Sequence, residues 1–237
     1  MARAKIPSDL LTIANYGPIE AAEFLHLHPE TLRYWISAES GPLIISARRH
    51  PPILSFKNLL ECYVLDIIRR IHKISMPKVR FSVETIRNLQ NARHLMHSSY
   101  PLADHELRVD NNRRLYVYDL HGRIVNLTAG GQIEFPEVVE TCLRRVVRDR
   151  DGVGVSFYPF LSRHESLEQG AQDPNYIVVN PRISFGKPVI SGTGITTQII
   201  AGRLIAGDTE QELVDEYGRT LAEIRAAAQF ENVPVAA

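Results

Sequence analysis

The segment from Asp173 to Gly207 restricts the fold of this chain more than any other, because glycine and proline interrupt it repeatedly. Short β-branched runs such as 177–179 and 195–197 lie between the interruptions. Glycine permits positive φ and proline fixes φ, so the pattern predicts tiny strands joined by tight turns. An amphipathic helix should follow these strands and end at Gly207.

Two more helices are expected at the C-terminal end, over Thr209 to Glu216 and over Thr220 to Phe230. Each begins with a threonine that is followed three residues later by glutamate, which predicts a capping box. Gly218 lies in the turn between them. The last helix has few basic residues and several alanines, which favours packing against protein over contact with phosphate.

This C-terminal segment resembles the domain-of-unknown-function family numbered 433. The resemblance is specific because several fixed spacings agree at once. Gly194 departs from the family pattern, since many members have arginine there. The residues that carry the resemblance are Asp173-Pro174, Gly186-Lys187-Pro188-Val189-Ile190, Gly192-Thr193, Ile195, Gly207, Glu212-Leu213, Tyr217, Leu221, Ile224 and Ala227-Ala228.

The resemblance implies a function. Members of this family are small helix-turn-helix-like modules, and the larger multidomain form resembles VapB-type antitoxins, whose partners are PIN-domain ribonuclease toxins. Such an antitoxin binds its toxin directly and needs no catalytic activity. PIN-type ribonucleases gather carboxylates around a divalent metal, so basic side chains of this module are expected to pair with them. The expected toxin-binding residues are Arg182, Lys187, Thr193 and Arg225.

The N-terminal part has the spacing of a helix-turn-helix. Pro18 and Pro29 open two short helices, over 18–25 and 29–37, that a short turn separates. The second helix contains the run T-L-R-Y-W, which resembles the DNA-binding domain of MerR-type regulators, and residues 41–52 would form a wing. Trp35 and Ile36 are expected to pack inward. The expected DNA-binding residues are Thr31, Arg33, Tyr34, Arg48 and Arg49.

The rest of the chain suggests an α+β fold that is mainly helical. Ser55 should cap a long apolar helix to Ile71, and Pro77 should start another. Strands over 107–109, 113–119 and 124–125 should form an antiparallel meander. The expected division is a winged helix-turn-helix with its following helices over 1–98, a central meander with a helix over 99–164, and a helix-turn-helix-like module with short strands over 165–237.

An apolar stripe in the central region predicts a helix from Phe135 to Val147. Its opposite face would be solvated. A further strand is expected over 152–158, followed by a linker over 163–172. The basic residues assigned to the solvated face are Arg144, Arg145 and Arg148.

The formal net charge is zero but unevenly distributed. Residues 1–100 carry 13 Lys and Arg against 8 Asp and Glu, whereas residues 165–237 carry 5 against 10. The basic end suits operator DNA, and the acidic end suits another role. A helix-turn-helix repressor usually pairs to meet symmetric half-sites, so a homodimer is expected.

Other features of the sequence favour a cytoplasmic protein. The sequence lacks a membrane-length apolar run, and its N-terminal end lacks the apolar core of a secretory signal. Cys62 and Cys142 are expected to be buried thiols.

The sequence contains only fragments of the known motifs for catalysis and cofactor binding. Gly152-x-Gly154 lacks the third glycine of a dinucleotide loop, and Gly186-Lys187 lacks the surroundings of a phosphate loop. His94, His97 and His105 form no recognisable ligand set for zinc. We therefore expect no catalytic residue, cofactor or metal. A stand-alone transcription factor whose C-terminal module senses a small ligand is the alternative to an antitoxin, and an enzyme with an unrecognised site is a more remote third.

Overall fold

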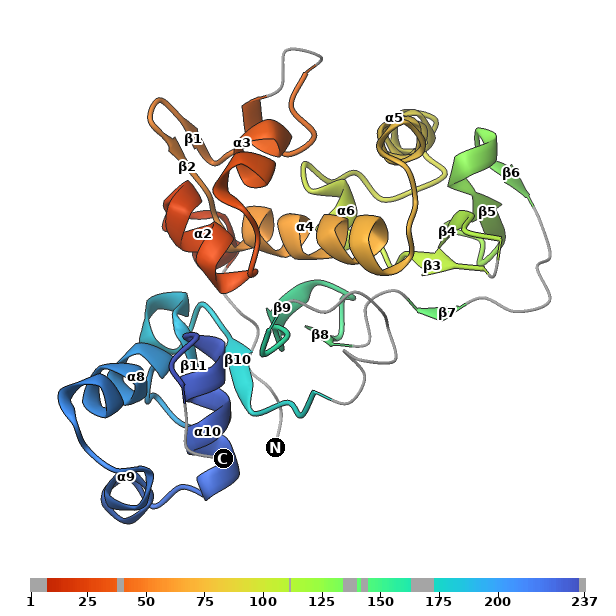
Figure 1. The fold of residues 1–237 in the computed structure, drawn as a ribbon. Helices are drawn as coiled ribbons and strands as arrows, with labels where there is room; N and C mark the ends of the chain where they lie inside the picture. The colour runs from red at the N-terminus through yellow and green to blue at the C-terminus, as the bar shows by residue number, and fades with distance from the viewer. Residues whose placement is uncertain are drawn as a thin grey trace.

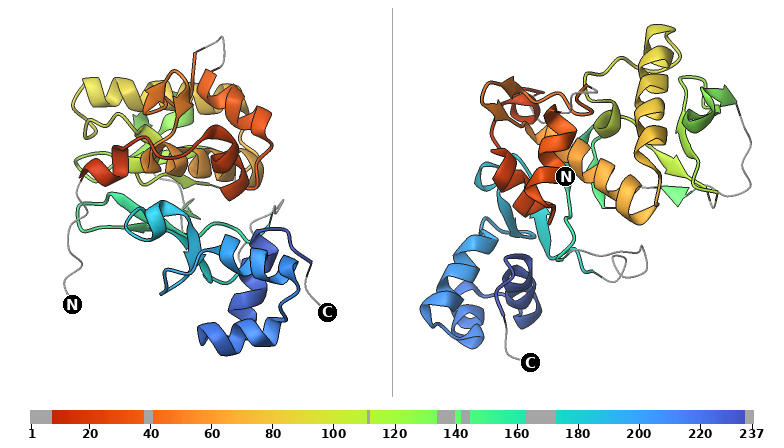
Figure 2. Two further views of the ribbon diagram at one scale, coloured as in Figure 1. Left: turned by 90° about the vertical axis from the view of Figure 1, so that its left-hand side faces the viewer. Right: turned by 45° about the horizontal axis from the view of Figure 1, so that its top comes forward.

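The structure is a computed structural model and describes residues 8–37, 41–110, 112–133, 140–141, 145–162 and 173–234. Helix α4 (Phe56–Asp66) runs through its middle (Figure 1). Helix α3, a small hairpin and helix α5 lie on one side of α4, and a sheet with the C-terminal helices lies on the other (Figure 1 and Figure 2). The chain is a mixed α/β protein with small antiparallel sheets.

The N-terminal elements are short. The predicted helices after Pro18 and Pro29 are both present, and Leu32, Trp35 and Ile36 of the second are buried, which confirms the inward packing expected of the latter two. Their assignment to a winged helix-turn-helix stays a prediction. The elements before α4 are α1 (Ser8–Thr12), α2 (Pro18–Phe24), α3 (Pro29–Ser37) and the antiparallel strands β1 (Arg48–Arg49) and β2 (Pro52–Ile53).

Helix α4 is the centre of the larger hydrophobic core, and all of its residues are buried. Ser55 caps it as predicted, because its hydroxyl accepts a hydrogen bond from the Asn58 backbone N–H at 3.2 Å. The Asn58 amide donates to the carbonyl oxygen of Ile45, 2.9 Å away, and so fixes the segment after α3. A π-helical turn, Ile67–Ile71, continues the helix.

The predicted meander is confirmed as part of a five-stranded antiparallel sheet in the order β6-β5-β4-β3-β7. Helix α5 packs beside it and begins next to Pro77, as predicted. The elements of this region are α5 (Met76–Asn91), α6 (Pro101–Asp104), β3 (Arg108–Val109), β4 (Leu115–Tyr118), β5 (Ile124–Asn126), the 3-10 turn η2 (Leu127–Ala129), β6 (Gln132–Ile133) and β7 (Glu140–Thr141).

The helix predicted from Phe135 to Val147 is wrong where the structure describes it. Residues 140–141 form β7, and Val146–Arg148 form β8, which pairs with β9 (Gly154–Phe157). The remaining residues of the predicted helix, 135–139 and 142–144, lie outside the described residues. The β8–β9 turn explains the error, because Asp151-Gly152 is a strong hairpin signal and Gly152 has a φ of 79°.

The arginines assigned to a solvated helix face have another role. Arg144 lies outside the described residues. The Arg145 guanidinium donates to the carbonyl oxygens of Tyr158, Pro159 and Asp173 at 2.8–3.1 Å. Arg148 donates to three backbone carbonyls, those of Ala103, His105 and Gly152. Both described arginines therefore tie strands to neighbouring loops, and the prediction of a solvated face is wrong for them.

A second sheet, in the order β11-β10-β9-β8, links the central and C-terminal regions. Its strands β10 (Ile177–Val179) and β11 (Pro188–Ile190) belong to the glycine-rich segment. The expected boundary after residue 164 therefore separates two hydrogen-bonded strands, β9 and β10. Val179 joins the larger core, whereas Ile177 and Ile190 join a second, C-terminal core.

Helices α8 (Thr197–Ala206), α9 (Glu210–Tyr217) and α10 (Leu221–Phe230) surround the second core. Both predicted capping boxes are present, at Thr209 and Thr220. Gly207 ends α8 with a φ of 107°, as predicted. None of the helices in the described part of the chain is long and apolar enough to cross a membrane.

Candidate functional site

Helix α3 presents one polar face outward. Its buried side holds Leu32, Trp35 and Ile36, so the 3.6-residue period leaves Arg33 and Tyr34 exposed, with Thr31 at the margin. The Arg33 side chain is 60% exposed and pairs with Glu30 at 2.6 Å. A pair this exposed is weakly held, so Arg33 can exchange Glu30 for a phosphate.

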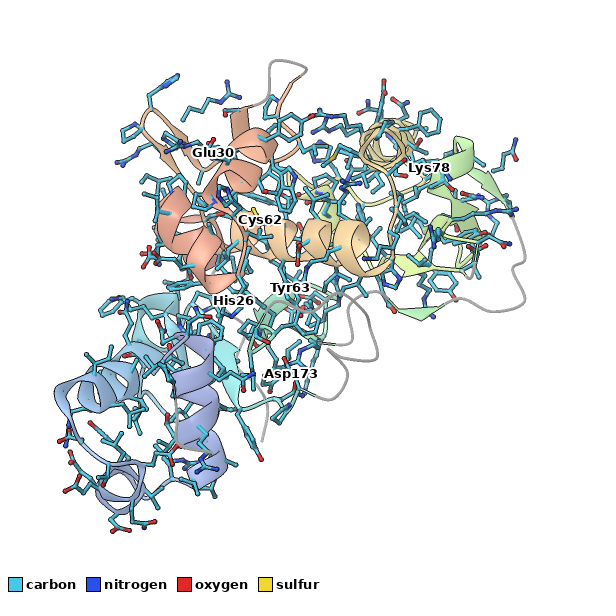
Figure 3. The ribbon with its side chains drawn as sticks, viewed as in Figure 1. His26, Glu30, Cys62, Tyr63, Lys78 and Asp173 are labelled. Atoms are coloured by element: carbon cyan, nitrogen blue, oxygen red, sulfur yellow. The ribbon has the colours of Figure 1, made fainter. Side chains whose placement is uncertain are left out.

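A residue of α5 supports this face. The Arg80 guanidinium lies over the Tyr34 ring, 5.7 Å from its centroid, and donates to the carbonyl oxygen of Gly41 at 2.9 Å. Arg80 was not predicted from the sequence, because its contact with Tyr34 joins two helices and no short stretch of sequence indicates it. Lys78, also on α5, is exposed and lies on the same side of α4 as Glu30 (Figure 3).

The β1–β2 hairpin places two more predicted residues on that side of the molecule. Arg48 and Arg49 form β1 and are both exposed. They pair in register with Ile53 and Pro52 of β2. We define the cationic face as five basic side chains, one on α3, two on β1 and two in the first turns of α5. Its members are Arg33, Arg48, Arg49, Lys78 and Arg80.

The predicted C-terminal residues do not form a single cluster. Arg182 and Lys187 are exposed in the β10–β11 loop, residues 180–187. The Thr193 hydroxyl donates to the Ile190 carbonyl oxygen at 2.8 Å and accepts from the Ile195 N–H at 3.1 Å. Thr193 therefore shapes the turn after β11, and any contact with a partner stays a prediction.

Arg225 lies on α10 and binds Glu210 of α9 through two hydrogen bonds of 2.9 Å. These bonds raise the pKa of the Arg225 guanidinium. Two other basic residues of the module are paired in the same way, Arg203 with Asp208 and Glu216, and Arg219 with Glu223. The β10–β11 loop carries the other two basic residues of the module, Arg182 and Lys187, and both are exposed.

The N-terminal region holds the β10–β11 loop in place. The Asn15 amide donates to the Phe185 carbonyl oxygen at 2.8 Å, and the Tyr16 hydroxyl donates to that of Gly186 at 3.2 Å. Burial raises the pKa of Tyr16 to about 12, so its hydroxyl stays a donor. A side chain at Gly186 would place its Cβ 1.9 Å from the Tyr16 oxygen, which explains why this position is glycine.

Within the part of the chain that the structure describes, no group of three His, Cys, Asp or Glu side chains could hold a metal ion. His105 is buried beside the Gln90 amide at 3.0 Å. Cys62 is a buried free thiol, as predicted, and burial raises its pKa. Cys142 lies outside the described residues.

Comparison with known proteins gives a family match in the C-terminal part of the chain. Residues 177–230 match the family described as "Protein of unknown function (DUF433)". These residues contain β10, the β10–β11 loop, β11 and the three C-terminal helices, in agreement with the resemblance seen in the sequence.

Two comparisons, one of sequences and one of structures, each give a match over nearly the whole chain. A Mycobacterium tuberculosis protein named "Putative antitoxin VapB45" is 28% identical over 241 aligned residues, which cover 90% of this chain and 91% of the relative. The crystal structure of Rv2018, also from Mycobacterium tuberculosis, matches with a TM-score of 0.57 at 20% identity, over 91% of this chain and 97% of that one. The second similarity concerns the fold alone.

Proposed function

We propose that this chain is the antitoxin of a toxin–antitoxin pair. The similarity to the VapB45 relative carries this proposal, because it extends over nine-tenths of both chains rather than over one module. The match of residues 177–230 to the DUF433 family adds support, since the resemblance noted in the sequence links such modules to antitoxins.

The proposed partner is a PIN-domain ribonuclease, which this chain inactivates by direct binding. The β10–β11 loop is the favoured contact surface, because Arg182 and Lys187 are exposed there. Carboxylates around the toxin's metal are suitable acceptors for these cations. Thr193 and Arg225 remain candidate contacts, although both already have partners within the chain.

We propose that the cationic face binds the operator and represses the operon. Its five basic side chains lie on three elements on one side of α4, which suits neutralisation of several phosphates. Thr31, Arg33 and Tyr34 would face the major groove, and Arg48 and Arg49 would contact the backbone. A homodimer would place two such faces on symmetric half-sites.

The proposal expects a PIN-domain ribonuclease to be encoded next to this chain, and a growth-rescue assay with that protein tests the function. The full chain should restore growth when the toxin is induced. The charge-reversed variant Arg182→Glu/Lys187→Glu should rescue poorly, while Arg33→Ala/Arg48→Ala/Arg49→Ala should rescue fully but lose operator binding. Point variants are preferable to truncation, because the β9–β10 pairing would be cut. Absence of rescue by the full chain would contradict the proposal.

The cationic face also favours a second candidate, a stand-alone DNA-binding transcriptional regulator. That function predicts operator binding without any toxin partner. The two candidates separate in the same assay, since a stand-alone regulator would give no rescue.

A further inference from the structure

Phe185 is the most exposed large apolar side chain among the described residues. It is 86% exposed, whereas Ile205 of the same module, the next such residue there, is 74% exposed. Its side chain therefore contributes little buried area to the fold. Exposed aromatic groups are common anchors in protein–protein interfaces.

The backbone at Phe185 is unfavourable for any residue with a side chain. Ser184, Phe185 and Gly186 have φ values of 46°, 57° and 78°, so two non-glycine residues adopt the left-handed region in succession. Glycine would adopt this conformation without the steric penalty. The fold therefore gives no reason for phenylalanine at this position, which points to a role outside folding.

Contacts from the N-terminal region fix the direction in which Phe185 projects. Asn15 and Tyr16 donate hydrogen bonds to the carbonyl oxygens of Phe185 and Gly186, which belong to two successive peptide groups. The phenyl ring is thus exposed on a backbone whose two successive carbonyl groups are held by the N-terminal region. A preorganised anchor loses less conformational entropy on binding than a free loop does.

The charges beside Phe185 define the surface that it fits. Arg182 and Lys187 flank it in the sequence, and both side chains are exposed. An apolar ring between two cations is complementary to an apolar pocket that is bordered by carboxylates.

We propose that Phe185 is the anchor of toxin recognition and enters an apolar pocket bordered by carboxylates on the toxin. Arg182 and Lys187 pair with those carboxylates at the rim. This inference rests on the proposed antitoxin function and assigns the binding energy to a residue that the sequence analysis overlooked.

The test measures the affinity of the purified full chain for the neighbouring PIN-domain protein by calorimetry. Phe185→Ala and Phe185→Gly should each weaken the complex at least about 30-fold, the effect of an interface hot spot. Both variants should unfold at a temperature equal to or above that of the unmodified chain. Ile205→Ala, which removes another exposed apolar side chain of the module, should leave the affinity unchanged.

The outcomes separate this inference from the proposed function. If the unmodified chain does not bind the PIN-domain protein, the proposed function fails. If the unmodified chain binds and Phe185→Ala binds within about threefold of it, the anchor is overturned while the function stands. If Phe185→Ala abolishes self-association and leaves toxin affinity intact, Phe185 contacts a second copy and the inference is equally overturned.

Discussion

The Tyr16 hydroxyl donates a hydrogen bond to the carbonyl oxygen of Gly186, 3.2 Å away and 170 residues further along the chain. This bond joins the segment before α2 to the loop between β10 and β11. The Asn15–Phe185 bond lies beside it, so the N-terminal region and the C-terminal module meet at a loop with two exposed cations.

Substitution of Gly186 should disturb this junction. Gly186→Ala places a Cβ 1.9 Å from the Tyr16 oxygen, and should lower the free energy of unfolding by about 2–3 kcal/mol. Gly192→Ala is the matched control, because Gly192 has a similar φ of 79° but no heavy atom within 4 Å of its Cβ position. The Gly192→Ala variant should lose only about 1 kcal/mol of unfolding free energy, which is the cost of a side chain at a positive φ. If chemical denaturation gives equal losses of unfolding free energy for the two variants, the close contact between Gly186 and Tyr16 is contradicted.

Arg145 should stabilise the sheet that joins the central and C-terminal regions. Its guanidinium reaches three carbonyl oxygens and lies 5.1 Å from the centroid of the Phe160 ring. Arg145→Ala should lower the free energy of unfolding by about 2–3 kcal/mol, because three partly buried acceptors lose a charged donor. Arg145→Lys should recover little of this lost stability, since one ammonium group does not reproduce the several donors of the planar guanidinium group. Full stability of the lysine variant in chemical denaturation would count against this role.

Glu61 should make stability depend on pH. Burial in α4 raises the pKa of its carboxyl from 4.5 to about 8. The folded chain then holds a proton that the unfolded chain releases between these values, so stability should fall as pH rises through this window. Glu61→Gln keeps an acceptor for the Leu102 N–H and removes the titration.

The difference in unfolding free energy between Glu61→Gln and the unmodified chain should therefore grow from pH 5 to pH 8. Its size is on the order of a few kcal/mol. Parallel stability profiles of the two proteins across this range would refute the assignment.

The cationic face should bind DNA in a salt-dependent manner. Arg33→Ala should cost about 1–3 kcal/mol if Arg33 reads a base, and Arg48→Ala/Arg49→Ala should weaken binding on all sequences alike. Arg150, exposed in the β8–β9 turn, provides a control whose replacement by alanine should leave affinity unchanged. Fluorescence anisotropy with promoter DNA at several salt concentrations measures these effects. Unchanged affinity in both cationic-face variants would remove this face as the DNA interface.

Much of the fold could be predicted from local signals. Ser55, Thr209 and Thr220 are caps because a hydroxyl binds a backbone N–H within the next turn, and such pairs are visible in a short window of sequence. Gly207 ends a helix for an equally local reason.

The sequence predictions that were wrong or missing concern contacts between segments that lie far apart in the chain. The stripe from 135 to 147 has the helical period, yet the Asp151-Gly152 turn and pairing with β9 make residues 146–148 a strand. The roles of Arg80 and Arg145 depend on partners in other elements, and Tyr16 meets Gly186 only after the chain has folded. Periodicity gives no information on any of these pairings.

The most direct test of the antitoxin proposal is co-purification with the product of the adjacent PIN-domain reading frame. The two proteins should elute together at micromolar concentration in size-exclusion chromatography, and adding the full chain should suppress the ribonuclease activity of the partner. Separate elution with unchanged ribonuclease activity would contradict the account.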